Sequence, residues 1–176
     1  MLAKITTISL CLITFTAQAQ VSIGKTTVDG NSTLLDFNNS SGNTNGIIIP
    51  AVNNIINALA AQPSNNNGTF VFDKSENKIK VYENNVWKNM SSEGSSSNLV
   101  TNTSSESTSQ QGMIMGSNTS NAKGILVLES PNKTVVIPKI ANPHLNVKTP
   151  YTGMICYDTT SKSLAVFDGN KWNYWK

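Results

Sequence analysis

The 176-residue chain has thirteen lysines, no arginine and ten acidic residues, which give a formal net charge of +3. Arginine provides the bidentate contacts to guanine and phosphate, so its absence argues against nucleic-acid recognition. There is no basic block suited to a membrane surface. Cys11 and Cys156 are the two cysteines. If Cys11 leaves with a leader, the remaining chain has no internal disulfide and depends on packing or oligomerisation.

The first nineteen residues have the layout of a secretory signal peptide. Lys4 supplies a positive start, residues 5–16 form an apolar core, and residues 17–19 form a small-x-small cleavage site. We expect cleavage after Ala19 and a secreted or cell-surface protein. The apolar run of the leader is too short for a membrane-spanning helix, so it is not interpreted as a membrane anchor. No transmembrane segment is expected in the processed chain either. Lipidation of Cys11 is rejected because Leu10 precedes it where such sites need a small side chain.

Three blocks of sequence occur twice in the same order, which predicts one β-rich module written twice. The paired blocks are VSIGKTTVDGNSTLLDF (21–37) with MIMGSNTSNAKGILVLES (113–130), GIIIPAVNN (46–54) with TVVIPKIAN (134–142), and GTFVFDKSENKIKVYENNVWKN (68–89) with GMICYDTTSKSLAVFDGNKWNY (153–174). We therefore divide the chain into a signal peptide (1–19), module 1 (20–90), a Ser/Thr-rich linker (91–112) and module 2 (113–176).

The predicted fold is mainly β, with several short strands, a C-terminal three-stranded meander and at most one short helix in each module. In module 1 strands are expected at 21–24, at 34–37, and as a buried run at 47–49 that Pro50 ends. Apolar residues at helical spacing predict a short helix across 52–59, and Pro143 shortens or starts its counterpart. Asp168-Gly169 and Asn84-Asn85 predict hairpin turns with positive φ.

The search for catalytic groups finds little. His144 is the single histidine, so with Cys156 the processed chain offers too few ligands for a zinc site. Asp73 and Asp158 each precede a polar loop, where an aspartate accepts backbone hydrogen bonds, and this interpretation is preferred to a glycosidase pair. Cys156 lies in an apolar run and is interpreted as a small buried hydrophobe. We expect no catalytic residue, cofactor or metal.

The aromatic residues are the candidate contact sites. Trp87 and Trp172 occupy equivalent positions in the last strand of each module. Either tryptophan could close a small core, which we favour, or stack on a sugar ring. Tyr174 and Trp175, near the end of the sequence, are the better candidates for exposed contacts with a ligand or partner.

The blocks resemble a repeat of exported surface proteins of Bacteroidota-type bacteria, with the pattern VGIGTTxPxxxAxLDI, GVLLPRMT and NPxxGMxIYDTTxKxLxYYDGTxW. GMICYDTTSKSLAVFDGNKW is the closest match, whereas the proline after GIGTT and the arginine after LLP are missing. The opening block is similar to segments of phage tail fibres and trimeric adhesins. The resemblance implies an extracellular, β-rich homo-oligomer, with a trimer favoured.

We therefore expect a non-enzymatic structural or adhesive surface protein, a component of a fibre or stalk that contacts a surface glycan or protein. The alternative is a glycan-binding module that uses the paired tryptophans. A hydrolase is a distant third, and it would depend on Asp158.

Overall fold

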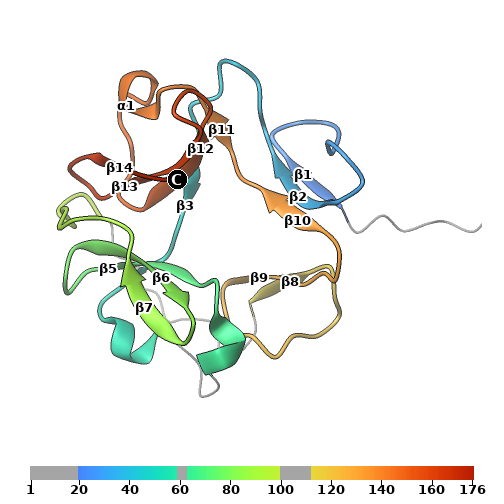
Figure 1. The fold of residues 1–176 in the computed structure, drawn as a ribbon, viewed down its shortest axis with the longest axis horizontal. Coiled ribbons are helices and arrows are strands. Elements are labelled where there is room, and N and C mark those ends of the chain that lie inside the picture. Colours follow the sequence, from blue (N-terminus) through green and yellow to red (C-terminus); the bar gives the residue numbers. More distant parts are fainter. Residues whose placement is uncertain (1–19, 59–62, 100–111) are drawn as a thin grey trace, which may run out of the picture.

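The computed structural model describes residues 20–58, 63–99 and 112–176. The predicted signal peptide and residues 100–111 of the predicted linker lie outside these ranges. The described chain is mainly β and contains a single four-residue α-helix, which confirms the predicted fold class. Figure 1 shows two sheets gathered on the left of the molecule and two smaller ones on the right.

We call the residues before the interval 100–111 the first half of the chain and the residues after it the second half. The strands of the first half are β1 (Val21–Ile23), β2 (Thr33–Phe37), β3 (Ile47–Ile48), β4 (Ala51–Val52), β5 (Phe70–Asp73), β6 (Lys78–Glu83) and β7 (Val86–Asn89). The second half contains β8 (Met113–Met115), β9 (Leu126–Leu128), β10 (Thr134–Val136), β11 (Lys139–Ile140), helix α1 (Pro143–Asn146), β12 (Met154–Asp158), β13 (Ser163–Phe167) and β14 (Trp172–Trp175). The observed strands therefore lie close to the expected ones.

Two four-stranded arrays have the same construction. Their orders are β4-β5-β6-β7 and β11-β12-β13-β14, and in each the first pair is parallel and the others antiparallel. Their registers also correspond, since Tyr82 faces Trp87 in the first array and Phe167 faces Trp172 in the second. Each array ends in the three-stranded meander expected from the sequence.

The hairpin turns follow the predicted chemistry. Asn84 and Asn85, between β6 and β7, have φ values of 51° and 62°, and Gly169, between β13 and β14, has a φ of 97°. Asparagine tolerates this left-handed region better than most residues, and glycine has no Cβ to clash there. After these turns the tryptophan-containing strands form the outer edges of the arrays, β7 in the first array and β14 in the second.

The helix predicted across 52–59 is wrong over most of residues 52–58, and Leu59 lies outside the described residues. Val52 belongs to β4, which pairs in parallel with β5, and only Ile55–Asn57 form a turn of 3₁₀ helix. The side chain of Asn54 caps this turn by accepting a hydrogen bond from the backbone N–H of Ile56. Helical spacing of apolar residues misled the interpretation because the first of them is used by a sheet. The counterpart helix begins at Pro143, as expected.

The two halves of the chain interlock rather than pack as separate bodies. Strand β3 from the first half extends the second array by pairing antiparallel with β12, and β10 from the second half pairs in parallel with β2. The three-stranded sheet therefore has the order β1-β2-β10. The division into two modules stays a prediction, but neither half completes its sheets alone within the described chain.

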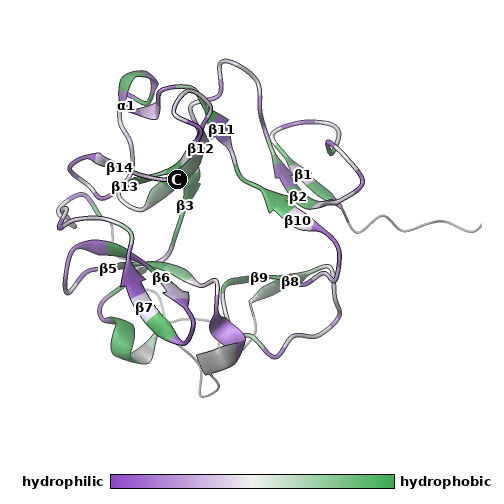
Figure 2. Cartoon of the chain, in the orientation of Figure 1, coloured by the Kyte–Doolittle hydropathy of each residue, from purple (hydrophilic) through white to green (hydrophobic). Residues whose placement is uncertain are grey.

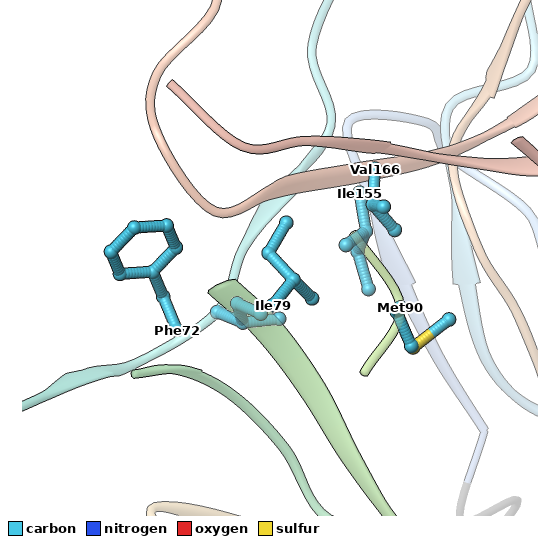
Figure 3. Packing of buried hydrophobic residues seen from close by; sticks show 6 residues of the cluster. Phe72, Ile79, Met90, Ile155 and Val166 are labelled. Atoms are coloured by element: carbon cyan, nitrogen blue, oxygen red, sulfur yellow. The ribbon is translucent and has the colours of Figure 1, made fainter. Parts of the chain in front are cut away.

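The main hydrophobic core also draws on both halves. Ile79 and Met90 from the first half pack with Ile155 and Val166 from the second. Figure 3 shows Ile155 and Val166 lying above Ile79 and Met90 between the two arrays. Phe72, a residue of β5, belongs to the same cluster and lies at its side in Figure 3. A smaller cluster around Cys156 lies on the second array. Burial of apolar surface therefore joins the arrays.

Part of the predicted linker contacts the second array directly. The backbone N–H of Ser95 donates to the carbonyl oxygen of Asp168 at 2.8 Å, and that of Gly94 donates to Asn77 at 2.8 Å. Leu99 packs against the main core cluster. Residues 91–99 therefore lie between the two arrays and contact both.

Candidate functional site

The candidate site is the ribbon formed by β8 and β9, together with Ile125, which precedes β9. The two strands pair in parallel, with Met113 opposite Leu126 and Met115 opposite Leu128. In the described chain neither strand has a second partner. Ile125 is 74% exposed, Met113 59% and Leu126 46%. The ribbon thus combines unpaired strand edges with large apolar side chains in contact with solvent.

Such a ribbon is not expected to be stable on its own. Parallel strands in proteins are usually covered on both faces, and an isolated two-stranded sheet is at best marginally stable. Open edges also present unpaired N–H and C=O groups to any strand that approaches. These properties identify the ribbon as a surface that another strand or chain would cover.

The rest of the chain holds the ribbon by a few contacts. The backbone N–H of Lys123 donates to the side-chain oxygen of Asn66 at 3.3 Å. Gly116, which follows β8 with a φ of 90°, comes close to the side chain of Leu34 on β2. Figure 2 shows apolar sequence along β3, β9 and β10, and Val135 on β10 is also exposed. Exposed apolar residues therefore occur outside the ribbon as well.

Each of the paired tryptophans rests against an aromatic residue of its own array. Trp87 meets Tyr82 edge-to-face with 5.2 Å between ring centroids, and Trp172 meets Phe167 at 5.4 Å with the rings tilted. Both tryptophans are half-buried, and Trp172 packs against the cluster around Cys156. The structure does not bring the two tryptophans into one site, and their role in ligand binding stays a prediction.

Tyr174 and Trp175 are exposed on β14, as expected from their place near the end of the sequence. The Tyr174 hydroxyl lies 2.9 Å from Nδ1 of His144, so the single histidine has a hydrogen-bond partner. Partial burial is the largest cause of the pKa of Tyr174 being raised above its ordinary value. The indole N–H of Trp175 is bonded to the carbonyl oxygen of Met90. Contact of Tyr174 and Trp175 with a ligand or partner stays a prediction.

Asp73 and Asp158 are buried and serve turns, as the sequence predicted. Oδ1 of Asp158 accepts from the backbone N–H groups of Thr160 and Asn142, each at 2.9 Å. Asp73 likewise accepts from the backbone N–H and hydroxyl of Ser75. Burial alone would raise the pKa of both carboxyls. Hydrogen bonds, including one from the Ser161 hydroxyl to Asp158, and the charge of the Lys80 ammonium 3.3 Å from Asp73 outweigh burial and hold each pKa below its ordinary value. Both groups therefore remain ionised acceptors rather than acids.

Cys156 is the other side chain that the sequence analysis considered for reactivity. Cys156 is fully buried, and burial followed by the charge of Asp158 raises the pKa of its thiol to about 12. It is the small buried hydrophobe expected from its sequence context. In residues 20–58, 63–99 and 112–176, no group of three or more histidine, cysteine or acidic side chains could hold a metal ion. Within the same ranges, no helix has the length and apolarity required to cross a membrane.

Comparison with known families gives one finding. Residues 107–176 match the family described as a phage tail like trimerisation region. The matched segment contains every strand from β8 to β14, including the exposed ribbon. It covers less than half of the 176 residues. Searches of curated proteins and of solved structures found no match.

The sequence pointed to the tail-fibre likeness but not to the ribbon as a site. The earlier candidates were aromatic, whereas the ribbon presents methionine, isoleucine and leucine. Its signal in the sequence was the pair of short apolar runs MIM and ILVL, in a chain otherwise rich in asparagine, serine and threonine. Periodicity does not reveal whether such a run is covered by its own chain.

Proposed function

We propose that the chain is a non-enzymatic structural protein, a homotrimeric fibre or stalk component that is exported and contacts other molecules at the cell surface. The observation that carries the proposal is the exposed parallel ribbon β8–β9, which lies inside the segment that matches a trimerisation region. A fibre component needs strands that remain available to neighbouring copies, and this ribbon supplies them.

The energetics favour association at this surface. Full burial of a large aliphatic side chain contributes about 1.5–3 kcal/mol, and Met113, Ile125 and Leu126 are all substantially exposed in one chain. Pairing of the open edges would also satisfy backbone groups that otherwise depend on water. Binding between folded copies stabilises them by mass action, so the processed chain, whose single cysteine allows no internal disulfide, gains stability from assembly.

The test is the mass of the processed chain in solution. Multi-angle light scattering of residues 20–176 at micromolar concentration is expected to give three times the mass of one chain. A single-chain mass under these conditions would refute the proposal. Replacement of an exposed ribbon residue by a charge, Leu126→Asp, is expected to reduce the mass to that of one chain. The matched control is Ile56→Asp, which places the same charge on a residue that is 81% exposed outside the ribbon.

Export is supported by the three-part leader in residues 1–19. Expression of the full chain in a bacterial host and mass spectrometry of the exported protein are expected to give an N-terminus at Gln20. Retention of the uncut chain inside the cell would refute this part of the proposal. A matched variant, Ala17→Leu, makes the cleavage site bulky and is expected to leave the leader attached.

A further inference from the structure

In the described chain the outer edge of β2 pairs with β10, whereas the equivalent outer edge of β9 has no strand partner. We propose that β3 of a neighbouring copy pairs in parallel with the open edge of β9, so that copies join head to tail through their strands. The proposal rests on the proposed function, because it specifies which strands join the copies of the homotrimer.

The first step is the equivalence of β2 and β9. Strand β1 pairs in parallel with β2, placing Val21 opposite Leu35, and β8 pairs in parallel with β9, placing Met113 opposite Leu126. A backbone hydrogen bond of 2.9 Å closes each pair just beyond the strand, from Asn38 to Ile23 and from Glu129 to Met115. Leu35 and Leu126 therefore occupy the same position in two copies of one substructure.

The second step is the difference between their outer edges. The outer edge of β2 is covered by β10, which pairs with it in parallel. In the described chain β9 has no such third strand. Burial follows this difference, because Leu34 and Leu35 are 2% and 1% exposed whereas Ile125 and Leu126 are 74% and 46% exposed. Strand β9 thus has apolar residues like those of β2, but no third strand buries them.

The third step identifies the strand that fits the edge. In the aligned blocks GIIIP and TVVIP, β3 is the counterpart of β10, and Ile47 corresponds to Val135. Val135 faces Leu35 within the chain. The same register places Ile47 of a neighbouring copy opposite Leu126. Strand β3 already pairs with β12 along one edge, and its other edge has no strand partner in the described chain.

The remaining open edges agree with the same junction. Within the chain β3 pairs antiparallel with β12, so Ile47 faces Ile155. Val135 is the counterpart of Ile47 in the aligned blocks. Phe70 is the counterpart of Ile155, because each is paired with the equivalent valine of the next strand, Val81 and Val166. Ile155 is buried, whereas Phe70 is only half-buried and Val135 is exposed. Val135 of one copy is thus expected to face Phe70 of the next.

These contacts join different surfaces of two copies, so the interface is head to tail. Such an interface generates a closed ring when its rotation allows closure. Each chain supplies β9 and β10 at one junction, and it supplies β3 and β5 at the other. Closure after three copies would leave none of these edges open, which is consistent with the match to a trimerisation region.

Disulfide cross-linking tests the assignment. Cα atoms of directly paired strands are about 5 Å apart, within the range that a disulfide spans. Ile47→Cys and Leu126→Cys are made in separate full-length chains, which are co-expressed, oxidised and separated without reductant. A covalent dimer that dithiothreitol separates into single chains is expected from the mixture and not from either variant alone. The control pairs Leu126→Cys with Val86→Cys, an exposed residue on β7 that the junction does not use.

The outcomes separate this inference from the proposed function. A trimer by light scattering that gives no 47–126 cross-link would overturn the strand assignment and leave the trimer intact. A monomer would overturn both, and cross-linking of Leu126→Cys chains to one another would replace the head-to-tail junction by a symmetric one. If Ile47→Cys impairs folding, Phe70→Cys with Val135→Cys tests the second contact, and its cross-link is expected under the same conditions.

Discussion

The indole N–H of Trp175 donates a hydrogen bond to the carbonyl oxygen of Met90, with 2.6 Å between the heavy atoms. Trp175 ends the last strand of the second array, and Met90 follows the last strand of the first. Met90 is itself buried with Ile155 and Val166 in the core that joins the arrays. The bond therefore reinforces, at the edge, an attachment that the core makes by burial.

Removal of this bond is expected to weaken the attachment of the arrays. Trp175→Phe keeps an aromatic ring but has no N–H, and loss of one hydrogen bond costs about 1 kcal/mol. The measurement is the free energy of unfolding from urea denaturation. The control is Tyr174→Phe, which removes only the exposed hydroxyl beside His144 and should cost less. Equal losses in the two variants would mean that the Met90 bond has no special role.

Gly94, in the predicted linker, is expected to tolerate a side chain poorly. A Cβ at this residue would lie 2.6 Å from Cβ of Asp168 and closer still to its carbonyl oxygen. Gly94→Ala must therefore displace the chain and break the hydrogen bond from Ser95 to Asp168, at a cost of about 2 kcal/mol. The readout is thermal unfolding of the purified chain.

Gly42→Ala is the matched control, because a Cβ at Gly42 meets no atom within 4 Å. We expect its melting temperature to be unchanged or slightly higher, since alanine restricts the unfolded chain more than glycine does. If Gly94→Ala behaves like Gly42→Ala, residues 91–99 do not pack between the arrays as described.

The local structure was largely predictable from the sequence, because turn residues report it directly. Asn84, Asn85 and Gly169 adopt the positive φ that their residue types favour. Asp73 and Asp158 accept the turn hydrogen bonds that their positions implied. Each of these relationships lies within a few residues of chain, so local pattern suffices to find it.

The connections between the halves were not predictable in the same way. Aligned blocks suggest modules with separate cores, yet Ile155 packs with Ile79, and β3 pairs with β12. Apolar runs such as those of β3 and β10 give no indication of which strand they will join. The exposed ribbon was missed for the same reason, because its exposure follows from the absence of a third strand beside β9 rather than from its own residues.

Replacement of a paired tryptophan decides between a structural and a glycan-binding role. Trp172 is half-buried and contacts Phe167, so Trp172→Ala is expected to lower the free energy of unfolding by about 2 kcal/mol, less than for a fully buried tryptophan. Trp87→Ala in the first array is the matched variant and should behave similarly. Glycan-array binding by the parent chain that disappears in Trp172→Ala without loss of stability would instead support the glycan-binding alternative.

The thiol of Cys156 is expected to be unreactive in the folded protein. Burial raises its pKa to about 12, and the thiolate rather than the thiol attacks alkylating reagents. Iodoacetamide at pH 8 should therefore leave the native processed chain unlabelled, whereas the same reagent in guanidinium should label it fully, as measured by intact mass. Rapid labelling of the native chain would show that the cluster around Cys156 opens readily.

Acid is expected to destabilise the fold through its buried turn aspartates. The pKa values of Asp73 and Asp158 lie below the ordinary 3.8, because hydrogen bonds from neighbouring groups, and the charge of Lys80 beside Asp73, outweigh the effect of burial. The unfolded chain therefore binds more protons at low pH, and stability rises with pH. This contribution is complete well above 3.8. It is lost as the pH falls from about 5 through 3.8 and then through the lower pKa of the folded state.

The measurement is the free energy of unfolding from urea denaturation at a series of pH values between 7 and 3. Asp158→Asn should lower the stability at pH 7 and flatten the acid dependence, since the side chain at 158 no longer titrates. Asp73→Asn should have the same kind of effect in the first array. Glu93→Gln, in an exposed residue, is the control and should leave the pH profile unchanged. A steep acid loss that persists in the double Asp73→Asn and Asp158→Asn variant would assign the titration to other groups.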